Sequence, residues 1–254
     1  MSDAPSRFPL TSQVTHHLLT PEQVDSTNTL VRANAVDWDE WAVVATFSQV
    51  AGKGRLERSW VTRPGESLSA SILFPRASET HRSWLPLVVG ASIVSAAQAA
   101  GVSSAVVKWP NDVLVGASKL AGVLCEILPD ERVIVGLGIN LDFGGKTAPS
   151  PGATSVAEHA PIKPNTADEL LCFVVSALKM WAATPHEEVL HVSREVVEPN
   201  LETLGRQVSV VENDGSSWNG VALFLNDRGH LIVQEVASGR MKTVVASDIV
   251  HLRQ

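Results

Sequence analysis

The sequence predicts an α+β fold in which helices flank a mixed, mainly antiparallel sheet, followed by a small all-β unit. Short apolar strands between residues 105 and 141 are joined by turn-like connections, a pattern typical of antiparallel pairing. Apolar or amphipathic helical segments stand on both sides of this region. From Gly205 onward, short strands recur at regular intervals between Asn, Asp and Gly turns, as in small barrels.

The first part of the chain predicts a lead-in, a capped helix and a buried strand. Residues 1–24 contain Pro and Ser and show little periodicity, which predicts an irregular segment with frayed ends. The Asp-Ser-Thr-Asn segment at 25–28 supplies N-cap side chains for a helix over residues 30–35. Residues 42–47 are apolar and β-branched, which is typical of a buried strand, and the small residues at 48–54 predict a loop.

The middle of the chain predicts the main helix and the rest of the sheet. Residues 67–74 alternate polar with apolar side chains, which predicts a half-buried strand. Residues 85–100 predict a helix that stops at Gly101. Four further strands are expected at residues 105–108, 112–115, 121–128 and 132–141.

The last part predicts two helices and then the all-β unit. Residues 143–154 are rich in Gly, Pro and Ser and predict a mobile surface loop. Thr166 and Glu169 have the spacing of a capping box before an amphipathic helix that ends near residue 182. A second helix is expected from about residue 187 to just before Pro199. We place a domain boundary near Leu204, with strands expected beyond it at 207–211, 220–225, 231–236 and 243–246.

Composition and charge exclude some broad classes of protein. The net charge of -7 is the opposite of the clustered basic excess of duplex DNA-binding proteins. No stretch reaches the roughly 20 apolar residues that span a bilayer, and no signal peptide is evident. Cys125 and Cys172 lie in apolar runs, so we expect buried, reduced thiols. The sequence therefore predicts a cytoplasmic protein.

The segment from Lys108 to Gly122 holds the most informative pattern. Lys108, Asn111, Asp112, Lys119 and Gly122 are predicted to share one hairpin. Two cations beside an Asn-Asp pair are costly to cluster unless an anion lies between them. This pattern predicts a site for a small carboxylate and a phosphate.

A second basic segment starts at Gly52-Lys53-Gly54-Arg55. It does not form a P-loop, because Ser48 stands where that motif needs glycine and Gly54 follows the lysine. Taken alone, the segment is as well explained by a solvated basic turn. Its glycines can bring main-chain N–H groups to an anion, Arg55 and Arg58 can bind phosphate, and Trp60 can stack on a purine.

Three other patterns are weaker. His186 and His191 are five residues apart, which puts them on different sides of a helix and argues against a zinc site. The glycines at 136 and 138 lack the third glycine of a dinucleotide-binding motif. The segment 25–28 either only caps a helix or also presents N–H groups and hydroxyls to a polar ligand, together with Gln49.

Together these segments resemble the biotin protein ligases. The resemblance extends over residues 20–254 and follows chain order. It rests on Asp25-Ser26-Thr27-Asn28, on Gln49 with Gly52-Lys53-Gly54-Arg55 through Arg58 and Trp60, on Lys108-Trp109-Pro110-Asn111-Asp112, on Lys119-Leu120-Ala121-Gly122 and on Gly136-Leu137-Gly138-Ile139-Asn140. It implies a class II synthetase-like catalytic domain at residues 1–204 that binds biotin and ATP, and an SH3-like barrel at 205–254.

The resemblance also implies a two-step reaction. Biotin and ATP would form biotinyl-5′-AMP with the help of Mg²⁺, and a lysine of a biotin carboxyl carrier domain would then accept the biotinyl group. The partner would be an acyl-CoA or pyruvate carboxylase, with neither DNA nor a membrane involved. The chemistry needs cations where a carboxylate and a triphosphate meet.

The site residues follow from the resemblance, position by position. Lys119, Arg55 and Asp112 are expected to be catalytic, with Lys119 at the carboxylate and Asp112 orienting the carrier lysine. The biotin-binding set is Ser26, Thr27, Asn28, Gln49, Lys53, Gly54, Arg55, Lys119 and Gly122. The adenylate-binding set is Arg58, Trp60, Asn111 and Asn140. No protein side chain is assigned to a metal.

Two positions depart from the family pattern, and alternatives remain. Lys53 stands where arginine is common, and Glu57 where glycine is common, so the closed shape of this loop is expected to differ. The residues before Asp25 are too few for the DNA-binding module of some family members, so we expect an enzyme without repressor function. Alternatives are a lipoate ligase or octanoyl transferase of the same fold, a biotin-responsive DNA-binding regulator, and a non-catalytic adaptor.

Overall fold

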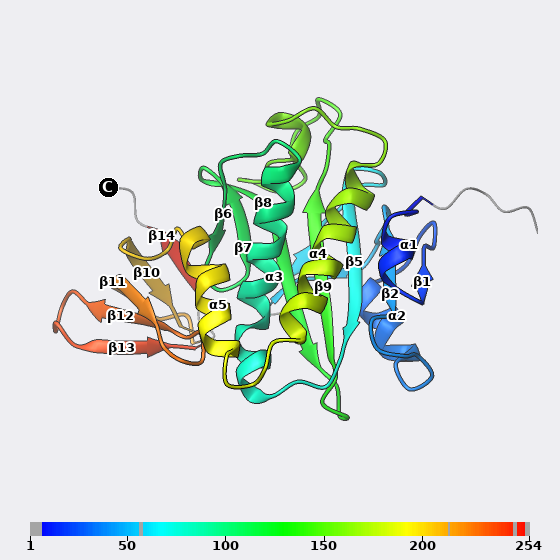
Figure 1. Cartoon of the computed structure of the whole chain (residues 1–254). Coiled ribbons are helices and arrows are strands. Elements are labelled where there is room, and N and C mark those ends of the chain that lie inside the picture. Colours follow the sequence, from blue (N-terminus) through cyan, green and yellow to red (C-terminus); the bar gives the residue numbers. More distant parts are fainter. Residues whose placement is uncertain (1–6, 56–57, 213, 246–247, 252–254) are drawn as a thin grey trace, which may run out of the picture.

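A computed structural model describes residues 7–55, 58–212, 214–245 and 248–251. Its centre is a seven-stranded sheet in the order β1-β2-β5-β9-β8-β7-β6 (Figure 1). Every pairing is antiparallel except that of β1 with β2, which confirms the predicted mixed, mainly antiparallel sheet. The strands are β1 (Leu18–Leu19), β2 (Val43–Thr46), β5 (Ser67–Phe74), β6 (Ala105–Lys108), β7 (Asp112–Val115), β8 (Ser118–Ile127) and β9 (Val133–Asn140).

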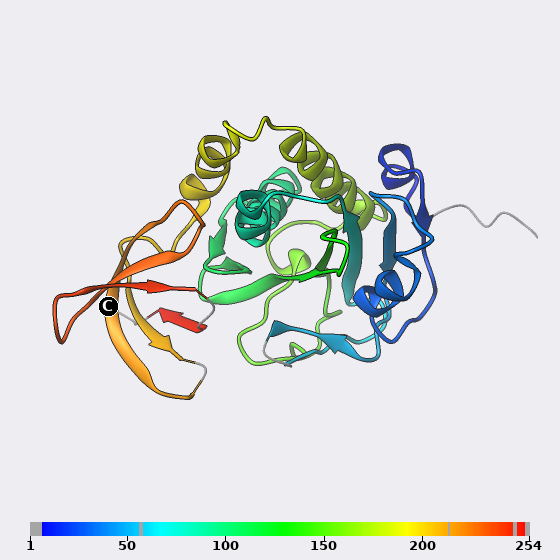
Figure 2. The same ribbon diagram turned by 90° about the horizontal axis from the view of Figure 1, so that it is seen from below.

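Helices cover the two faces of this sheet unequally. α3 (Glu79–Ala99), α4 (Thr166–Ala182) and α5 (Val189–Val197) lie together on one face, as Figure 2 shows. The other face carries α2 (Thr27–Asn34) and a small hairpin of β3 (Gly52–Lys53) and β4 (Ser59–Trp60). These elements cover the second face only in part (Figure 2).

The predicted half-burial of β5 is wrong. All eight residues of this strand are buried. Leu68, Ala70 and Ile72 belong to the main core, whereas the serines between them face α2 and the site described below. A strand that is covered on both faces buries its polar residues as well, and alternation alone does not reveal this.

α3 starts earlier than predicted, at Glu79 rather than near residue 85. Ser78 caps it, and its hydroxyl accepts a hydrogen bond from the N–H of His81. The first turns are polar, so the apolar pattern hid them, and Pro86 lies inside the helix. The predicted stop is confirmed, because Gly101 has a φ of 102°. The cap predicted for α2 is also confirmed, with Ser26 at its N-cap.

The described part of the lead-in contains a short helix and a short strand, contrary to the predicted irregular segment. α1 (Thr11–Val14) precedes β1, and Asp168 of α4 fixes its start. The carboxylate of Asp168 accepts hydrogen bonds from the N–H groups of Leu10 (2.7 Å) and Thr11 (2.8 Å) and from the Thr11 hydroxyl (2.7 Å). A buried carboxylate of a distant helix therefore supplies the order that the local sequence does not indicate.

The capping box predicted at the start of α4 is not formed. Asn165 is the N-cap residue, and its amide group donates to Glu169. Thr166 is already inside the helix, where its hydroxyl accepts from the N–H of Lys163. Short 3₁₀ turns, η2 (Val156–Glu158) and η3 (Glu198–Asn200), flank the two C-terminal helices.

The C-terminal part forms a separate antiparallel sheet in the order β13-β12-β11-β10-β14. Its strands are β10 (Gln207–Val211), β11 (Ser217–Leu225), β12 (Leu231–Glu235), β13 (Met241–Val244) and β14 (Asp248–His251), the last of which was not predicted. One turn of this sheet packs against the main body. There, the indole N–H of Trp84 donates to the carbonyl of Asp227 (2.9 Å), and that of Trp109 to the carbonyl of Gly229 (3.0 Å). Among the described residues no helix combines the length and apolarity of a membrane span.

Burial of His81 makes the stability of the fold dependent on pH. Burial lowers the pKa of His81 below its ordinary value of 6.5, and the positive charge of His186 adds to this effect. The unfolded chain therefore takes up a proton near pH 6.5, whereas the folded chain takes it up only at a lower pH, so stability falls as the pH falls through this range. We expect urea denaturation to show a lower unfolding free energy at pH 5.5 than at 7.5, by at most about 1.4 kcal/mol per pH unit for this group. His81→Gln should reduce that dependence, and an unchanged pH slope in the variant would contradict this.

Candidate active site

A cavity opens on the face of the sheet that carries α2 and the β3–β4 hairpin. It draws together nearly all of the predicted site residues from five separate stretches of chain. The predicted residues that line it are Ser26, Thr27, Asn28, Gln49, Lys53, Gly54, Arg55, Arg58, Trp60, Asn111, Asp112, Lys119 and Gly122. Lining residues that were not assigned beforehand are Ser59, Val123, Leu124, Gly136, Leu137 and Gly138.

The inner end of the cavity is a buried polar network at the start of α2. The side-chain carbonyl of Gln49 accepts hydrogen bonds from the N–H of Thr27 (2.8 Å) and from its hydroxyl (3.2 Å). The hydroxyl of Ser71, on β5, lies 2.7 Å from the Thr27 hydroxyl and 2.6 Å from the side-chain oxygen of Asn28. All four residues are buried. Ser71 was not predicted, because in the sequence it is only one polar residue of a strand.

Asn28 is held from the opposite side as well. Its amide group donates to the carboxylate of Glu126 on β8 (2.6 Å), which also forms an ion pair with Arg32 (2.8 Å). A Cβ atom added to Gly136 would lie 2.2 Å from the side-chain oxygen of Asn28. The glycine is therefore required by the close approach of Asn28, which no local pattern could show.

The indole ring of Trp60 packs against two glycines, Gly122 and Gly138. A Cβ atom at Gly138 would lie 2.4 Å from its indole ring, and one at Gly122 would lie 3.3 Å from it. The indole N–H is buried and has no hydrogen-bond partner in the described part of the chain. Gly122 and Gly138 therefore both make room for the flat indole ring.

The outer part of the cavity is strongly cationic. The ammonium group of Lys119 pairs with the Asp112 carboxylate at 2.6 Å. It also lies 5.6 Å from the centre of the Trp60 ring. The guanidinium of Arg55 donates to the side-chain oxygen of Asn111 (3.3 Å), whose amide group donates to the carbonyl of Val123 (2.7 Å). Four cationic side chains line this cavity against one carboxylate, that of Asp112; the cations belong to Lys53, Arg55, Arg58 and Lys119. Such a surplus of positive charge favours anionic ligands.

Two predicted residues take positions beside the cavity. Asn140 is buried and does not line it; its amide group donates to the carbonyls of Lys119 (3.2 Å) and Thr154 (3.0 Å). Its amide group therefore holds the main chain of Lys119 in place. Lys108 also lies away from the lining, and its charge helps to lower the pKa of His251. Glu57, where the loop departs from the family pattern, lies outside the described residues.

Among the described residues, no three His, Cys, Asp or Glu side chains form a group that could hold a metal ion. His191 instead lies 3.2 Å from Glu195 and is exposed. Cys125 and Cys172 are free and only partly buried, so the expected full burial is wrong. Burial still raises the pKa of the Cys125 thiol to about 12, which disfavours its reactive thiolate form.

Comparison with known proteins agrees with this geometry. Residues 20–143 match the model of the biotin/lipoate A/B protein ligase family. A biotin–[acetyl-CoA-carboxylase] ligase of Mycobacterium tuberculosis is 31% identical, over 91% of this chain and 87% of that protein. A ligase of the same name from Paracoccus denitrificans is 29% identical, over 84% of this chain and 92% of that protein.

Solved structures support the fold. The biotin protein ligase of Aquifex aeolicus in complex with biotin and ATP superposes with a TM-score of 0.73, covering 93% of this chain and 99% of that one at 22% identity. This likeness agrees with the α+β fold, and the small C-terminal sheet is consistent with an SH3-like domain. On the strength of its curated relatives, the chain belongs to the biotin protein ligase family and is a ligase.

Proposed function

We propose that the chain activates biotin with ATP as biotinyl-5′-AMP and transfers the biotinyl group to a lysine of a biotin carboxyl carrier domain. The observation that supports this most directly is a single cavity with two chemically different parts. Its inner end is a buried hydrogen-bonding network, and its outer part collects four cationic side chains. A neutral polar head group suits the first part, and two anions that must meet suit the second.

The inner end favours biotin over lipoate. The ureido ring of biotin has two N–H donors and a carbonyl acceptor, which can pair with the polar groups around Thr27, Asn28 and Gln49. The dithiolane ring of lipoate lacks strong donors and acceptors, so it would leave buried polar groups without partners. Calorimetric titration should therefore detect binding of biotin and much weaker binding of lipoate. Equal affinities would contradict this assignment.

The outer part suits the activation step. The biotin carboxylate attacks the α-phosphorus of ATP, the bond to the bridging oxygen breaks, and pyrophosphate leaves. Lys119 and Arg55 would stabilise the charge that gathers where the two anions meet. Trp60 and Asn111 would contact the adenylate, with Lys53 and Arg58 close to the phosphates. In the second step the carrier lysine attacks the acyl carbon, and AMP leaves.

Magnesium is expected to arrive with the triphosphate. Mg²⁺ prefers oxygen ligands in octahedral geometry and is commonly held by one or two carboxylates together with phosphates. The only carboxylate of the described cavity lining is that of Asp112, which is already paired with Lys119. The described lining therefore offers one carboxylate ligand at most. When bound, the ion would reduce the repulsion between the phosphates and the biotin carboxylate.

Asp112 is expected to matter most in the second step. Its carboxylate lies 2.6 Å from the ammonium group of Lys119, where it could also orient the ammonium group of an incoming carrier lysine. We expect Asp112→Asn to slow transfer from preformed biotinyl-5′-AMP by about 100-fold, with a smaller effect on adenylate formation. Single-turnover transfer to a carrier domain measures the first rate, and pyrophosphate release measures the second. Equal losses in both steps would contradict a role specific to transfer.

One experiment tests the proposed function as a whole. The protein is incubated with ATP, Mg²⁺, biotin and a carrier domain from an acyl-CoA carboxylase or a pyruvate carboxylase. Mass spectrometry should show the addition of one biotinyl group to the carrier, and a lysine-to-arginine variant of the carrier should stay unmodified. If neither carrier gains mass while an active ligase modifies both under the same conditions, the proposal fails.

A further inference from the structure

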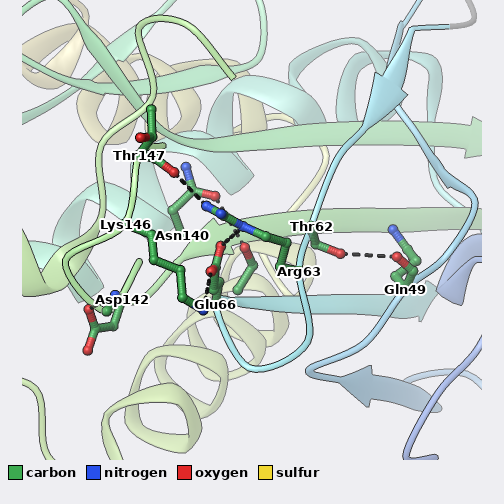
Figure 3. A network of polar contacts seen from close by, with 10 residues as sticks. Gln49, Thr62, Arg63, Glu66, Asn140, Asp142, Lys146 and Thr147 are labelled. Atoms are coloured by element: carbon green, nitrogen blue, oxygen red, sulfur yellow. Dashed lines mark hydrogen bonds and ion pairs between the residues drawn. The ribbon is translucent and has the colours of Figure 1, made fainter. Parts of the chain in front are cut away.

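An ion pair between a buried carboxylate and a partly exposed arginine lies outside the cavity lining. The carboxylate of Glu66 accepts a hydrogen bond from the Nε of Arg63 at 2.7 Å, and only 7% of its side chain is exposed (Figure 3). Its second oxygen is buried without a hydrogen-bond partner in the described structure and lies 3.8 Å from the ammonium group of Lys146. A carboxylate buried with one oxygen unsatisfied costs stability. The pair therefore calls for an explanation other than surface solvation.

The pair ties two loops together. Arg63 and Glu66 precede β5, whereas their partners belong to the segment after β9. The guanidinium of Arg63 donates to the carbonyl of Thr147 at 2.6 Å, and the main-chain carbonyl of Glu66 accepts from the N–H of Leu141 at 2.8 Å. We call Arg63 and Glu66 the loop clamp; Figure 3 shows it with Lys146 and Thr147.

The clamped segment leads directly to Lys119. At its far end, the N–H of Lys119 donates to the carbonyl of Gly152 (2.7 Å), and the N–H of Thr154 donates to the carbonyl of Lys119 (2.9 Å). Asn140 joins the same two strands of chain through its amide group. The main chain of Lys119 is thus held by the segment whose other end the loop clamp fixes.

The clamp is also connected to the inner end of the cavity. The hydroxyl of Thr62, next to Arg63, donates to the main-chain carbonyl of Gln49 at 3.1 Å (Figure 3). The N–H of Gly65 donates to the carbonyl of Phe47 at 2.8 Å. One short segment, residues 62–66, therefore contacts both the strand end that carries Gln49 and the loop that holds Lys119.

We propose that Arg63 and Glu66 are positioning residues for ligation: by clamping the two loops they set the main chain of Lys119 relative to the inner end of the cavity. The proposal rests on the proposed function for its catalytic consequence. Neither residue lines the cavity, so the clamp would act through Lys119 and not on the substrate. Loss of the clamp should then slow adenylate formation while leaving the head-group network at Thr27 and Asn28 in place.

The test compares Arg63→Ala with a matched control. Arg82 has the same kinds of partner, the Glu131 carboxylate at 3.2 Å and the Ala77 carbonyl at 3.0 Å, and neither it nor its partners line the cavity. Hydrogen exchange of the Lys119 and Thr154 amides is measured by NMR without ligand. We expect exchange at both amides to be at least about tenfold faster in Arg63→Ala and unchanged in Arg82→Ala. Only the loss of Arg63 loosens the segment that exchanges these hydrogen bonds with Lys119.

Kinetics supply the second part of the test. In Arg63→Ala we expect the rate of adenylate formation at saturating biotin and ATP to fall about tenfold, while the Kd for biotin changes less than about twofold. The double variant Arg63→Ala/Glu66→Ala should be no slower than Arg63→Ala, because both residues act through one contact.

The exchange and kinetic results can contradict the proposal in several distinct ways. Unchanged exchange at both amides would overturn the link to Lys119, whether or not the protein makes biotinyl-5′-AMP. Faster exchange with an unchanged adenylation rate would overturn the positioning role. A parallel loss of biotin affinity, rate and thermal stability would show a purely structural pair and would overturn it too. If the unaltered protein forms no adenylate, the proposed function fails, and the exchange data still decide whether the clamp holds Lys119.

Discussion

Lys119→Ala is expected to lower the rate of biotinyl-5′-AMP formation by about 10² to 10³-fold, the cost typical of removing one group that stabilises charge in a transition state. The ammonium group of Lys119 lines the cavity and is held at 2.6 Å by Asp112, so it is placed for a second carboxylate. Release of pyrophosphate under single-turnover conditions measures this rate. The Kd for biotin should rise far less, since the head-group network does not include Lys119.

Lys108→Ala is the matched control, because of the two lysines only Lys119 lines the cavity. The predicted single hairpin is wrong: Lys108 lies on β6 and Lys119 on β8, in two successive hairpins that share β7. We expect less than about a tenfold change in the adenylation rate for Lys108→Ala. Similar losses in both variants would contradict the separate roles given to the two lysines. Lys119→Arg should recover part of the rate through its charge, although its planar group cannot reproduce the geometry of an ammonium.

Gly136→Ala is expected to weaken biotin binding by about 10- to 100-fold, which corresponds to the roughly 1–3 kcal/mol cost of overpacking a tight site. The added methyl group would lie 2.2 Å from the side-chain oxygen of Asn28, so Asn28 must move. That movement breaks its hydrogen bonds with Ser71 and Glu126, both 2.6 Å long. Isothermal titration with biotin measures the effect.

Gly90→Ala provides the control for that substitution. A Cβ atom at Gly90, inside α3, would make only ordinary contacts with Val107 at 3.6 Å, so biotin affinity should stay unchanged. Alanine there should also stabilise the helix slightly, because glycine is the poorer helix former. A loss of biotin binding confined to Gly136→Ala would identify Asn28 as the cause, and unchanged binding in both variants would contradict the steric explanation.

The features of the site that could be predicted are those that depend on residues close together in the sequence. The N-cap at Ser26 and the turn before Lys119 depend on side chains that act within a few residues of their own position. The cationic side chains could also be assigned, because charge and spacing suffice to suggest an anion. Thirteen of the fourteen predicted site residues do line the cavity, and only Asn140 lies beside it.

What the sequence could not reveal depends on contacts between distant segments. Ser71 and Glu126 are single polar residues of ordinary strands, and they gain a role only because α2 brings Asn28 between them. The sequence shows glycines at 136 and 138 but not why glycine is needed there. Asn28 and Trp60, from other elements, approach these two positions too closely for a side chain. The order of residues 11–19 likewise comes from Asp168, which lies far along the chain.

The turn at residues 226–229 has a consequence for any attempt to divide this protein. Its carbonyls accept the indole N–H groups of Trp84, on the main helix, and of Trp109, next to the Asn111-Asp112 turn of the site. A fragment that ended near Leu204 would leave both indoles without acceptors, at about 1–3 kcal/mol each. Truncation would therefore destabilise the Asn111-Asp112 turn, because Trp109 beside it would lose its contact with the C-terminal sheet. The C-terminal sheet therefore supports the Asn111-Asp112 turn through Trp109, and an isolated N-terminal fragment is a poor template for engineering new acceptor specificity.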